Sequence, residues 1–198
     1  MADFFDVVRS QRACRSFSRE PVPEDSLLQV LQAATFAPSA ENRQPWVFVV
    51  VRDDERRAAI AELSRRAWEG GGREYAVPRL SRELLADVDS GVAAGFAAAP
   101  VMVVVCGDTR LANRHVLEAS VFPAVQNLLL AATALGLGSA LTTLPLTFRA
   151  ELAEVLGLPD ELRPMAAVPL GYPARPLGPP RRQPVSAKAH RERYGAGW

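Results

Sequence analysis

Cysteine and histidine are scarce in this 198-residue sequence, which limits the chemistry that its side chains can supply. The two cysteines, Cys14 and Cys106, make no disulfide framework and have no C-x-x-C partner, so we expect reduced and mostly buried thiols. The two histidines, His115 and His190, lie far apart and outside any carboxylate-rich segment. We therefore expect surface histidines, no metal site and no histidine base.

An excess of charge of one sign is also missing. The formal net charge is +1, which gives no overall field for nucleic acid or an anionic membrane, so any anion site must be local. The longest apolar candidate for a membrane span, 122–137, contains Gln126 and Asn127 and is too short for a bilayer. The N-terminal segment MADFFDVVRSQR lacks a signal-peptide pattern. We expect a cytoplasmic protein.

Several motifs with strong sequence signatures are absent as well. The sequence contains no Walker A loop, no G-x-S-x-G and no H-E-x-x-H, and no pair of carboxylates stands out for acid–base work. The segment Gly136-Leu137-Gly138 is a weak match to a dinucleotide-binding loop. It follows a predicted helix instead of a strand, and Leu141 occupies the place of the third glycine, so we reject a Rossmann interpretation.

The apolar pattern predicts helices and strands in an α+β order, without regular βαβ alternation. A short helix with Phe4, Phe5 and Val8 on one side opens the chain, and the glycine-rich segment 68–79 is expected to be flexible. After Tyr172 the composition becomes proline-rich, which predicts an extended C-terminal segment. Strands are predicted at 46–51, 101–105, 139–143 and 166–170. Further helices are predicted from Pro23 to the stop at Ala37–Ser39, at 54–68, at 118–135 with Pro123 near its start, and at 148–156. One more helix is predicted to end near Ala98.

Two segments remain that could bind a ligand. The first is a loop with Arg9, Arg12, Arg15 and Arg19, whose guanidinium groups suit a phosphate, although a solvated basic surface explains it equally well. The second is Ala37–Trp46, where serine, asparagine and glutamine lie between a helix end and a buried strand. These polar side chains could hydrogen-bond a flat heteroaromatic ring, or could form an ordinary turn. The residues alone therefore indicate a pocket for a phosphorylated, planar ligand.

Taken in order, these segments resemble the nitroreductase family of FMN enzymes. The family's R-R-S-x-R-x-F stretch corresponds to Gln11–Phe17, followed by Pro21-Val22-Pro23, and its A-P-S-x-x-N-x-Q-P-W motif matches Ala37–Trp46 at each specified letter. Further similar segments, in the right order, are Ala119–Leu128, Gly136–Ser139, Leu170–Pro173 and Arg181–Pro184.

The resemblance implies a nitroreductase-like α+β fold with a central mixed sheet flanked by helices. It implies an FMN-binding domain at 1–172, an extension at 173–198 that lies across the partner, and an intertwined homodimer with FMN at its interface. Arg12, Arg15 and Arg182 would meet the phosphate end, and the backbone of Thr143 or Leu144 would lie near the flavin N5. The residues that the resemblance assigns to FMN binding are Arg12, Ala13, Arg15, Pro38, Ser39, Ala40, Asn42, Gln44, Gly138, Ser139, Thr142, Thr143, Leu144 and Arg182, with Pro38 to Asn42 coming from the partner subunit.

The sequence departs from the family pattern at two positions. Gln11 stands where the family has its first arginine, and Ala13 stands where it has a serine. Loss of each charge-assisted bond weakens binding by about 1.5–3 kcal/mol, so FMN is held less tightly unless Arg9 or Arg181 compensates.

The resemblance implies that the flavin carries the chemistry and that the protein has no catalytic side chain of its own. The expected activity is ping-pong transfer from NAD(P)H through FMN to a nitroaromatic, a quinone or a similar small acceptor. Three alternatives stay open: a flavin-dependent dehydrogenase or oxidase of a biosynthetic substrate, an enzyme that fragments its own FMN, and a flavin-storing protein without turnover. The sequence does not distinguish NADH from NADPH, and the segment 68–90, expected to cover the pocket, contains no recognisable motif.

Overall fold

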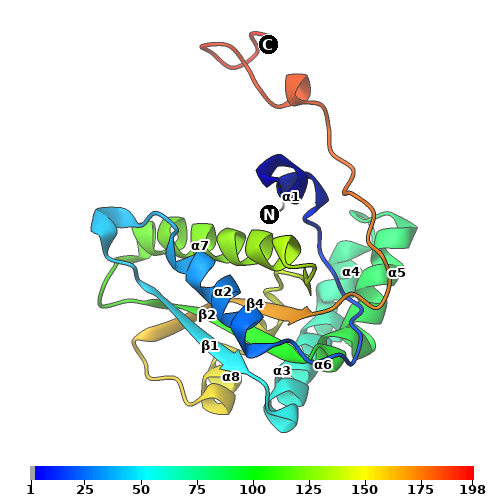
Figure 1. Cartoon of the computed structure of the whole chain (residues 1–198), viewed down its shortest axis with the longest axis vertical. Coiled ribbons are helices and arrows are strands. Elements are labelled where there is room, and N and C mark those ends of the chain that lie inside the picture. Colours follow the sequence, from blue (N-terminus) through cyan, green and yellow to red (C-terminus); the bar gives the residue numbers. More distant parts are fainter. Residues whose placement is uncertain (1–2) are drawn as a thin grey trace.

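The computed structural model describes residues 3–198 and builds them around a four-stranded sheet between two layers of helices (Figure 1). The strand order is β1-β2-β4-β3, and every pairing between these strands is antiparallel. Within residues 3–198 the parallel component of the expected mixed sheet is limited to an isolated bridge between Ala13 and Ser139. The strands are β1 (Trp46–Val51), β2 (Val101–Asp108), β3 (Gly138–Ser139) and β4 (Leu162–Gly171).

Helices form most of the connections, and several begin where the sequence supplies a capping side chain. The Asp53 carboxylate accepts the Arg56 N–H at the start of α3, and the Asn113 amide oxygen accepts N–H groups at the start of α7. The α-helices are α1 (Phe4–Ser10), α2 (Glu24–Thr35), α3 (Asp54–Ala67), α4 (Arg73–Ala76), α5 (Arg82–Ser90), α6 (Phe96–Ala98), α7 (Arg114–Ala134) and α8 (Arg149–Leu156). Shorter turns are the 3-10 helices η1 (Ala40–Asn42), η4 (Leu144–Phe148) and η5 (Val185–Ala187) and the π-helical turns η2 (Trp68–Gly72) and η3 (Gly91–Gly95).

Strand β2 is buried along its whole length because both faces of the sheet are covered. Val103 and Val105 pack into the core on the side of α2 and α7, whereas Met102 and Val104 pack into the core on the side of α3 and α8. This alternation is the two-residue period of a strand, and it explains why the sequence shows a continuous apolar run. Such a run predicts two covered faces, which an antiparallel sheet between helices provides as well as a parallel one.

The segment 68–79 differs from its sequence-based description. Instead of a flexible loop it forms η2 and α4, and Gly71, at φ 127°, takes the one backbone conformation that needs glycine there. Residues at the start of η2 and the start of α4 are bonded to the same carboxylate, because the Trp68 indole (2.8 Å) and the Arg73 guanidinium (2.9 and 3.1 Å) both donate to Asp89. These long-range bonds stabilise the helical conformation of a segment whose glycines disfavour it.

Helix α7 is longer than the sequence predicts and begins at Arg114, so Pro123 lies in its interior and not near its start. Its 21 residues are long and apolar enough to span a membrane, contrary to the expectation that no stretch reaches that length. A core helix passes the same test, and α7 packs against α2, β2 and β4 with residues such as Leu128 and Ala132 fully buried. This packing favours the core explanation.

The strand expected at 139–143 is shorter: β3 covers Gly138–Ser139, and Thr142 continues only as an isolated bridge to Ala167. Beyond Pro173, which is bridged to Phe17, the chain extends away from the body as a tail with the single short helix η5 (Figure 1). The proline-rich composition predicts this extended form.

Candidate functional site

A cavity of about 710 Å³ lies between the arginine loop, α5 and the first part of the C-terminal tail. Five arginines and two carboxylates line it, which gives an excess of three positive charges (5 − 2) at one place in a chain of net charge +1. The charged lining residues are Arg12, Arg15, Arg175, Arg181, Arg182, Glu83 and Asp87. This cavity therefore has the local positive charge that an anion site needs, and its lining includes the expected residues Arg12, Ala13, Arg15 and Arg182.

Arg15 is held inside this cavity by α5. Its guanidinium donates to the Asp87 carboxylate at 2.7 Å, and Arg175 from the tail approaches the same carboxylate at 3.5 Å. The Arg15 side chain is only 19% exposed, so of the two explanations left open for the arginine loop, the solvated surface does not describe this residue. An anion that enters the cavity meets an arginine whose orientation is already fixed by Asp87.

Two glycines let the arginine loop approach the helical wall. A Cβ on Gly95 would lie 1.8 Å from the Arg15 carbonyl oxygen, and a Cβ on Gly91 would lie 2.7 Å from the Arg15 Cβ. Both distances are far below van der Waals contact, so the position of Arg15 depends on the absence of side chains at 91 and 95.

The remaining arginines belong to the tail or touch it. The Arg12 Nη1 donates to the Gly178 carbonyl at 3.0 Å, and Arg182 donates to the Arg181 carbonyl, also at 3.0 Å. Arg9, named above as a possible replacement for the missing charge at Gln11, pairs with Asp6 at 3.2 Å and does not line the cavity. Arg181 does line the cavity, so its position allows it to replace the charge that is missing at Gln11.

The cavity is joined to the loop 138–144 through a short backbone connection. Ala13 is bridged to Ser139, and the Cys14 N–H donates to the Ser139 carbonyl at 2.9 Å. Gly138 allows this approach, because a Cβ there would lie 2.6 Å from the Cys14 Sγ. The Ser139 Oγ is buried without a hydrogen-bond partner among residues 3–198. Beside the arginine loop there is thus a hydroxyl that is free to hydrogen-bond a ligand.

Both thiols are buried, as the sequence analysis expects. Burial raises the pKa of Cys14, and it raises the pKa of Cys106 to about 12. Neither thiol is therefore ionised at neutral pH, and Cys14 fills space beside Gly138 and does not serve as a nucleophile.

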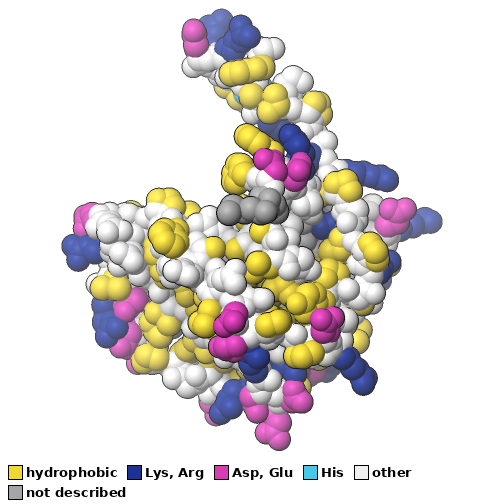
Figure 2. Space-filling model, in the orientation of Figure 1, with side chains coloured by type: hydrophobic (Ala, Val, Ile, Leu, Met, Phe, Trp, Pro, Cys, Tyr) yellow, Lys and Arg dark blue, Asp and Glu magenta, His cyan; other side chains and the backbone are white. Residues whose placement is uncertain are grey.

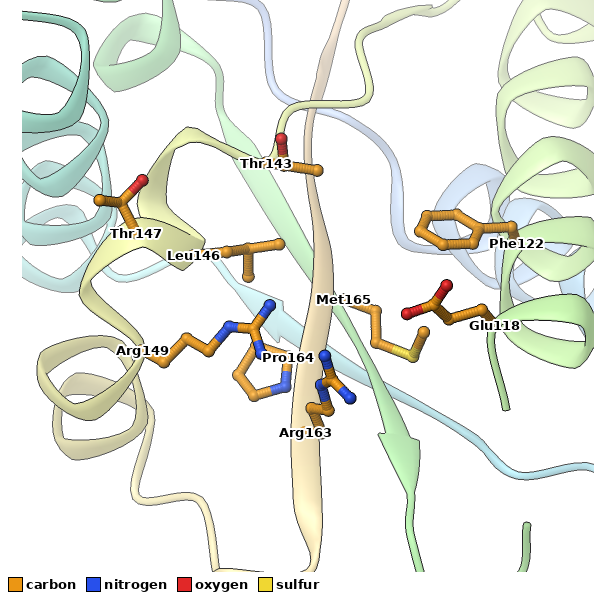
Figure 3. A pocket seen from close by; sticks show the side chains of 9 residues that line it. All are labelled: Glu118, Phe122, Thr143, Leu146, Thr147, Arg149, Arg163, Pro164 and Met165. Carbon is orange, nitrogen blue, oxygen red and sulfur yellow. The ribbon is translucent and has the colours of Figure 1, made fainter. Parts of the chain in front are cut away.

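From Ser139 the loop leads to a second cavity, which Thr143 lines (Figure 3). Thr142 is bridged to Ala167, and its Oγ1 accepts the Leu144 N–H at 3.3 Å, so the backbone here is held against β4. Thr143 is four positions after Ser139, which limits the distance between these two residues to about 14 Å. The loop therefore runs from the backbone that contacts the arginine loop to the second cavity within a short distance.

The segment Pro38–Gln44 lies elsewhere, at the far end of α2 from the arginine loop (Figure 1). Helix α2 has 12 residues and so separates the two segments by about 18 Å. The Ser39 Oγ accepts the Gln44 N–H at 3.0 Å, and the Ala40 N–H donates to the Ser120 Oγ at 3.2 Å. One chain does not bring this segment to the arginine cavity, which agrees with its expected contribution to the site of a partner.

The same segment is strained, because three of its non-glycine residues have positive φ. Glu41 and Asn42 have φ 54° and Gln44 has φ 50°. Such conformations cost on the order of 1–3 kcal/mol each and are concentrated at functional sites. The strain therefore supports a binding role for the A-P-S-x-x-N-x-Q segment over an ordinary turn.

The arginine loop, the loop from it to a second cavity and the strained polar segment fall within the part of the chain that matches a known family, whereas the cavity's tail residues Arg175, Arg181 and Arg182 lie beyond it. The family model described as Nitroreductase family matches residues 8–172. The chain belongs to the nitroreductase family. This membership confirms the expected α+β fold and the class of FMN-dependent oxidoreductases.

Individual members of the family show the same likeness. A Methanothermobacter thermautotrophicus protein named "Putative NADH dehydrogenase/NAD(P)H nitroreductase" is 31% identical over 181 residues, 89% of this chain and 80% of that protein. A Desulfovibrio desulfuricans structure described as "a putative nitroreductase in complex with fmn" has a TM-score of 0.76 and 27% identity, and covers 98% of this chain and 99% of its own. A structure of iodotyrosine deiodinase bound to FMN and 3-iodo-L-tyrosine has a TM-score of 0.73 and 27% identity over 92% of this chain and 96% of its own.

Three residues of the arginine cavity are not predicted from the sequence: its two carboxylates, Asp87 and Glu83, and Arg175. Segment 68–90 was expected to cover the pocket, and Ser81, Glu83, Leu84 and Asp87 do line it. One signal was available, because Gly91 and Gly95 are four residues apart on a helical segment, and that spacing is typical of a close approach between backbones.

Proposed function

We propose that this protein is a homodimeric FMN-dependent oxidoreductase that uses NAD(P)H to reduce a small acceptor such as a nitroaromatic compound or a quinone. The observation that carries the proposal is the arginine cavity, joined through the Ala13–Ser139 bridge to a loop that ends at a second cavity. The guanidinium groups of the first cavity suit a phosphate.

Each segment has a distinct task in this proposal. Arg12, Arg15 and Arg182 bind the phosphate in this proposal, which is supported by the excess positive charge of the cavity and by the Ser139 Oγ, buried without a partner among residues 3–198. The backbone of Thr142–Leu144 runs along the ring. Pro38, Ser39, Ala40, Asn42 and Gln44 contact the ring of the other subunit's flavin. When bound, FMN would take hydride from NAD(P)H and then pass two electrons to the acceptor in a second half-reaction.

In this proposal the chain binds and orients the flavin and shields it from solvent, and no side chain transfers a proton. Asp87 and Glu83 are the carboxylates of the arginine cavity, and Asp87 is engaged by Arg15 and Arg175. Reduction is favoured over the dehydrogenase or oxidase alternative because the names of relatives such as the Methanothermobacter protein, "Putative NADH dehydrogenase/NAD(P)H nitroreductase", give a nicotinamide as the electron donor.

The proposal is tested by an anaerobic titration of the FMN-loaded protein with NADH and, separately, NADPH, followed at the flavin absorption band. We expect complete bleaching by at least one nicotinamide and recovery on addition of a nitroaromatic or quinone. We also expect FMN to remain bound through gel filtration and FAD not to do so, since one phosphate anchor and no adenosine-binding fingerprint are present. A band that neither nicotinamide bleaches would contradict the reductase and favour either the dehydrogenase or the flavin-storing alternative.

The homodimer is supported by apolar side chains that one chain leaves exposed. Phe4, Phe5 and Val8 form the apolar side of α1, as the sequence predicts, yet they are 64%, 62% and 45% exposed. Figure 2 shows hydrophobic side chains on α1 and along the neighbouring tail, where Tyr194 and Trp198 are also exposed. Such a concentration of apolar surface is typical of an interface.

We expect light scattering at micromolar concentration to give twice the 21.4 kDa subunit mass. A truncation after Gly171 removes the tail and should lower the dimer's stability to dilution, because the contacts of residues 173–198 are lost. A subunit mass for the full chain would contradict the dimer. A truncated chain that stays dimeric and soluble would contradict only the role of the tail.

A further inference from the structure

The second cavity, of about 380 Å³, has its own chemistry, which the FMN site does not explain. Figure 3 shows Glu118 and Phe122 projecting from α7 on one side of Met165, and Arg149 and Arg163 lying on the other side. The complete lining is Glu118, Phe122, Thr143, Leu146, Thr147, Arg149, Arg163, Pro164 and Met165. One wall is thus aromatic and acidic, and the opposite wall is basic.

The three charged residues of this lining are not engaged with one another or with other side chains. Arg149, Arg163 and Glu118 take part in no ion pair and no side-chain hydrogen bond within residues 3–198, although ion pairs are frequent on the rest of this surface. Two guanidinium groups against one carboxylate leave a net charge of +1 in the cavity (2 − 1). That balance suits a ligand with a single negative charge.

The strand that supplies the basic wall is irregular at this point. Arg163, Pro164 and Met165 are consecutive and all line the cavity, which a regular strand with alternating faces does not allow. The pairing of β2 with β4 slips here, since Val105 is opposite Ala166 and Cys106 is opposite Pro164. Met165 is the extra residue, and bulges of this kind redirect side chains beside functional sites.

The bulged residue also needs space on the neighbouring strand, and Gly107 provides it. A Cβ on Gly107 would lie 2.8 Å from the Met165 Sδ. The bulge at Met165, and on the next strand a glycine paired with Arg163, together turn Met165 toward Phe122 and keep Arg163 at the cavity. The cavity wall is therefore formed by the backbone of the sheet and is not an accident of flexible surface side chains.

We propose that this cavity binds the carboxylate of a small aromatic acid, so that the preferred electron acceptor is an aromatic monoanion. The inference rests on the proposed function, because Thr143 connects the cavity to the loop assigned to the flavin ring. The carboxylate lies against Arg149 and Arg163, whose planar forks suit it. The ring packs on Phe122 and Met165, and its reducible group is directed toward Thr143.

Binding is tested without turnover by calorimetry on the FMN-loaded protein, with benzoate and its neutral analogue benzamide as probes. We expect benzoate to bind roughly tenfold more tightly than benzamide, because a charge-assisted bond to the half-buried Arg163 is added. Arg163→Ala should remove most of this preference, Arg163→Lys should restore part of it, and Arg149→Ala should lower it by about threefold, since Arg149 is exposed. The matched control is Arg114→Ala, which removes an arginine of α7 that does not line the cavity.

Glu118→Gln should change the benzoate affinity in the opposite direction from Arg163→Ala, which a general loss of structure would not do. Removal of the opposing negative charge should tighten benzoate binding by about two- to threefold, a modest change because Glu118 is exposed, and should leave benzamide binding unchanged. Equal affinities for benzoate and benzamide, or a benzoate affinity that Arg163→Ala and Glu118→Gln leave unchanged, would overturn the inference.

Turnover separates this inference from the proposed function. One NAD(P)H and one proton convert a nitro group to a nitroso group and water, so 4-nitrobenzoate and 4-nitrobenzamide can be compared in the same assay. We expect the higher kcat/KM for 4-nitrobenzoate, and Arg163→Ala should lower it mainly through KM. Equal reduction of both acceptors would contradict the inference and leave the reductase function standing. Reduction of neither acceptor, with benzoate still bound through Arg163, would contradict the function and leave the anion site standing.

Discussion

Gly95→Ala is expected to destabilise the protein by about 3 kcal/mol, which lowers the melting temperature of a chain of this size by about 6–12 °C. The new Cβ would overlap the Arg15 carbonyl oxygen, since the two atoms would be 1.8 Å apart. The obstacle is backbone and not the end of a flexible side chain, so either η3 or the arginine loop has to move. Movement of the loop displaces Arg15 from Asp87, and FMN affinity should fall along with stability.

A series of glycine-to-alanine variants tests this explanation by thermal unfolding. At Gly70 a Cβ meets nothing within 4 Å and φ is −77°, so Gly70→Ala should change the free energy of unfolding by no more than about 0.5 kcal/mol. Gly91→Ala meets the Arg15 side chain at 2.7 Å and should give an intermediate loss. If Gly95→Ala unfolds at the wild-type temperature, the close approach of the two segments is not needed.

Arg12→Ala and Arg15→Ala are each expected to weaken FMN binding by roughly ten- to a hundredfold, equivalent to about 1.5–3 kcal/mol. Each removes a charged donor from a sheltered anion. The two variants should differ in stability. Arg12 makes its hydrogen bond to a tail carbonyl, so its loss should leave folding almost unchanged, whereas loss of Arg15 also breaks the ion pair with Asp87 and should cost about 1 kcal/mol.

FMN affinity is measured by fluorescence titration of the apoprotein, and stability by denaturant unfolding without flavin. Arg12→Lys and Arg15→Lys should recover only part of the affinity, because a point charge does not reproduce a planar fork. The control is Arg56→Ala, an arginine of α3 that is 61% exposed and distant from the cavity. Wild-type FMN affinity in both alanine variants would show that the phosphate binds elsewhere.

The central elements of the fold could be predicted because their signals are local. Strand β1 begins and ends at Trp46 and Val51 as the apolar run predicts, and α3 follows from its alternation of charged and apolar residues. The segment 68–79 could not be predicted in the same way. Its helical form depends on bonds from Trp68 and Arg73 to Asp89, between 16 and 21 residues away, and such long-range bonds leave no periodic signal.

The residues of the candidate site also divide into those with a local sequence signal and those without one. Arg12, Arg15 and Ser39 are recognisable because they stand in short motifs of one segment. Asp87 is not, because it comes to Arg15 across 72 positions of the sequence and sits on a helix with other acidic residues. The basic wall of the second cavity is equally hidden, since it depends on a strand register that slips at Met165.

Strand β1 stands at one end of the sheet, and within residues 3–198 no strand pairs with its outer edge. Its six residues, WVFVVV, carry no charge, and an unpaired edge of this composition is a template for aggregation. During synthesis its partner β2 emerges only after residues 52–100, which at 5–20 residues per second leaves β1 unpaired for roughly 3–10 s. The acidic and basic residues that flank the strand, beginning with Arg52 and Asp53, then act as gatekeepers against association of nascent chains. The long helical connection that places Asp87 and Gly95 against the arginine loop thus delays the pairing of β1. The same segment that forms the cavity wall therefore increases the time during which a nascent chain can aggregate through β1.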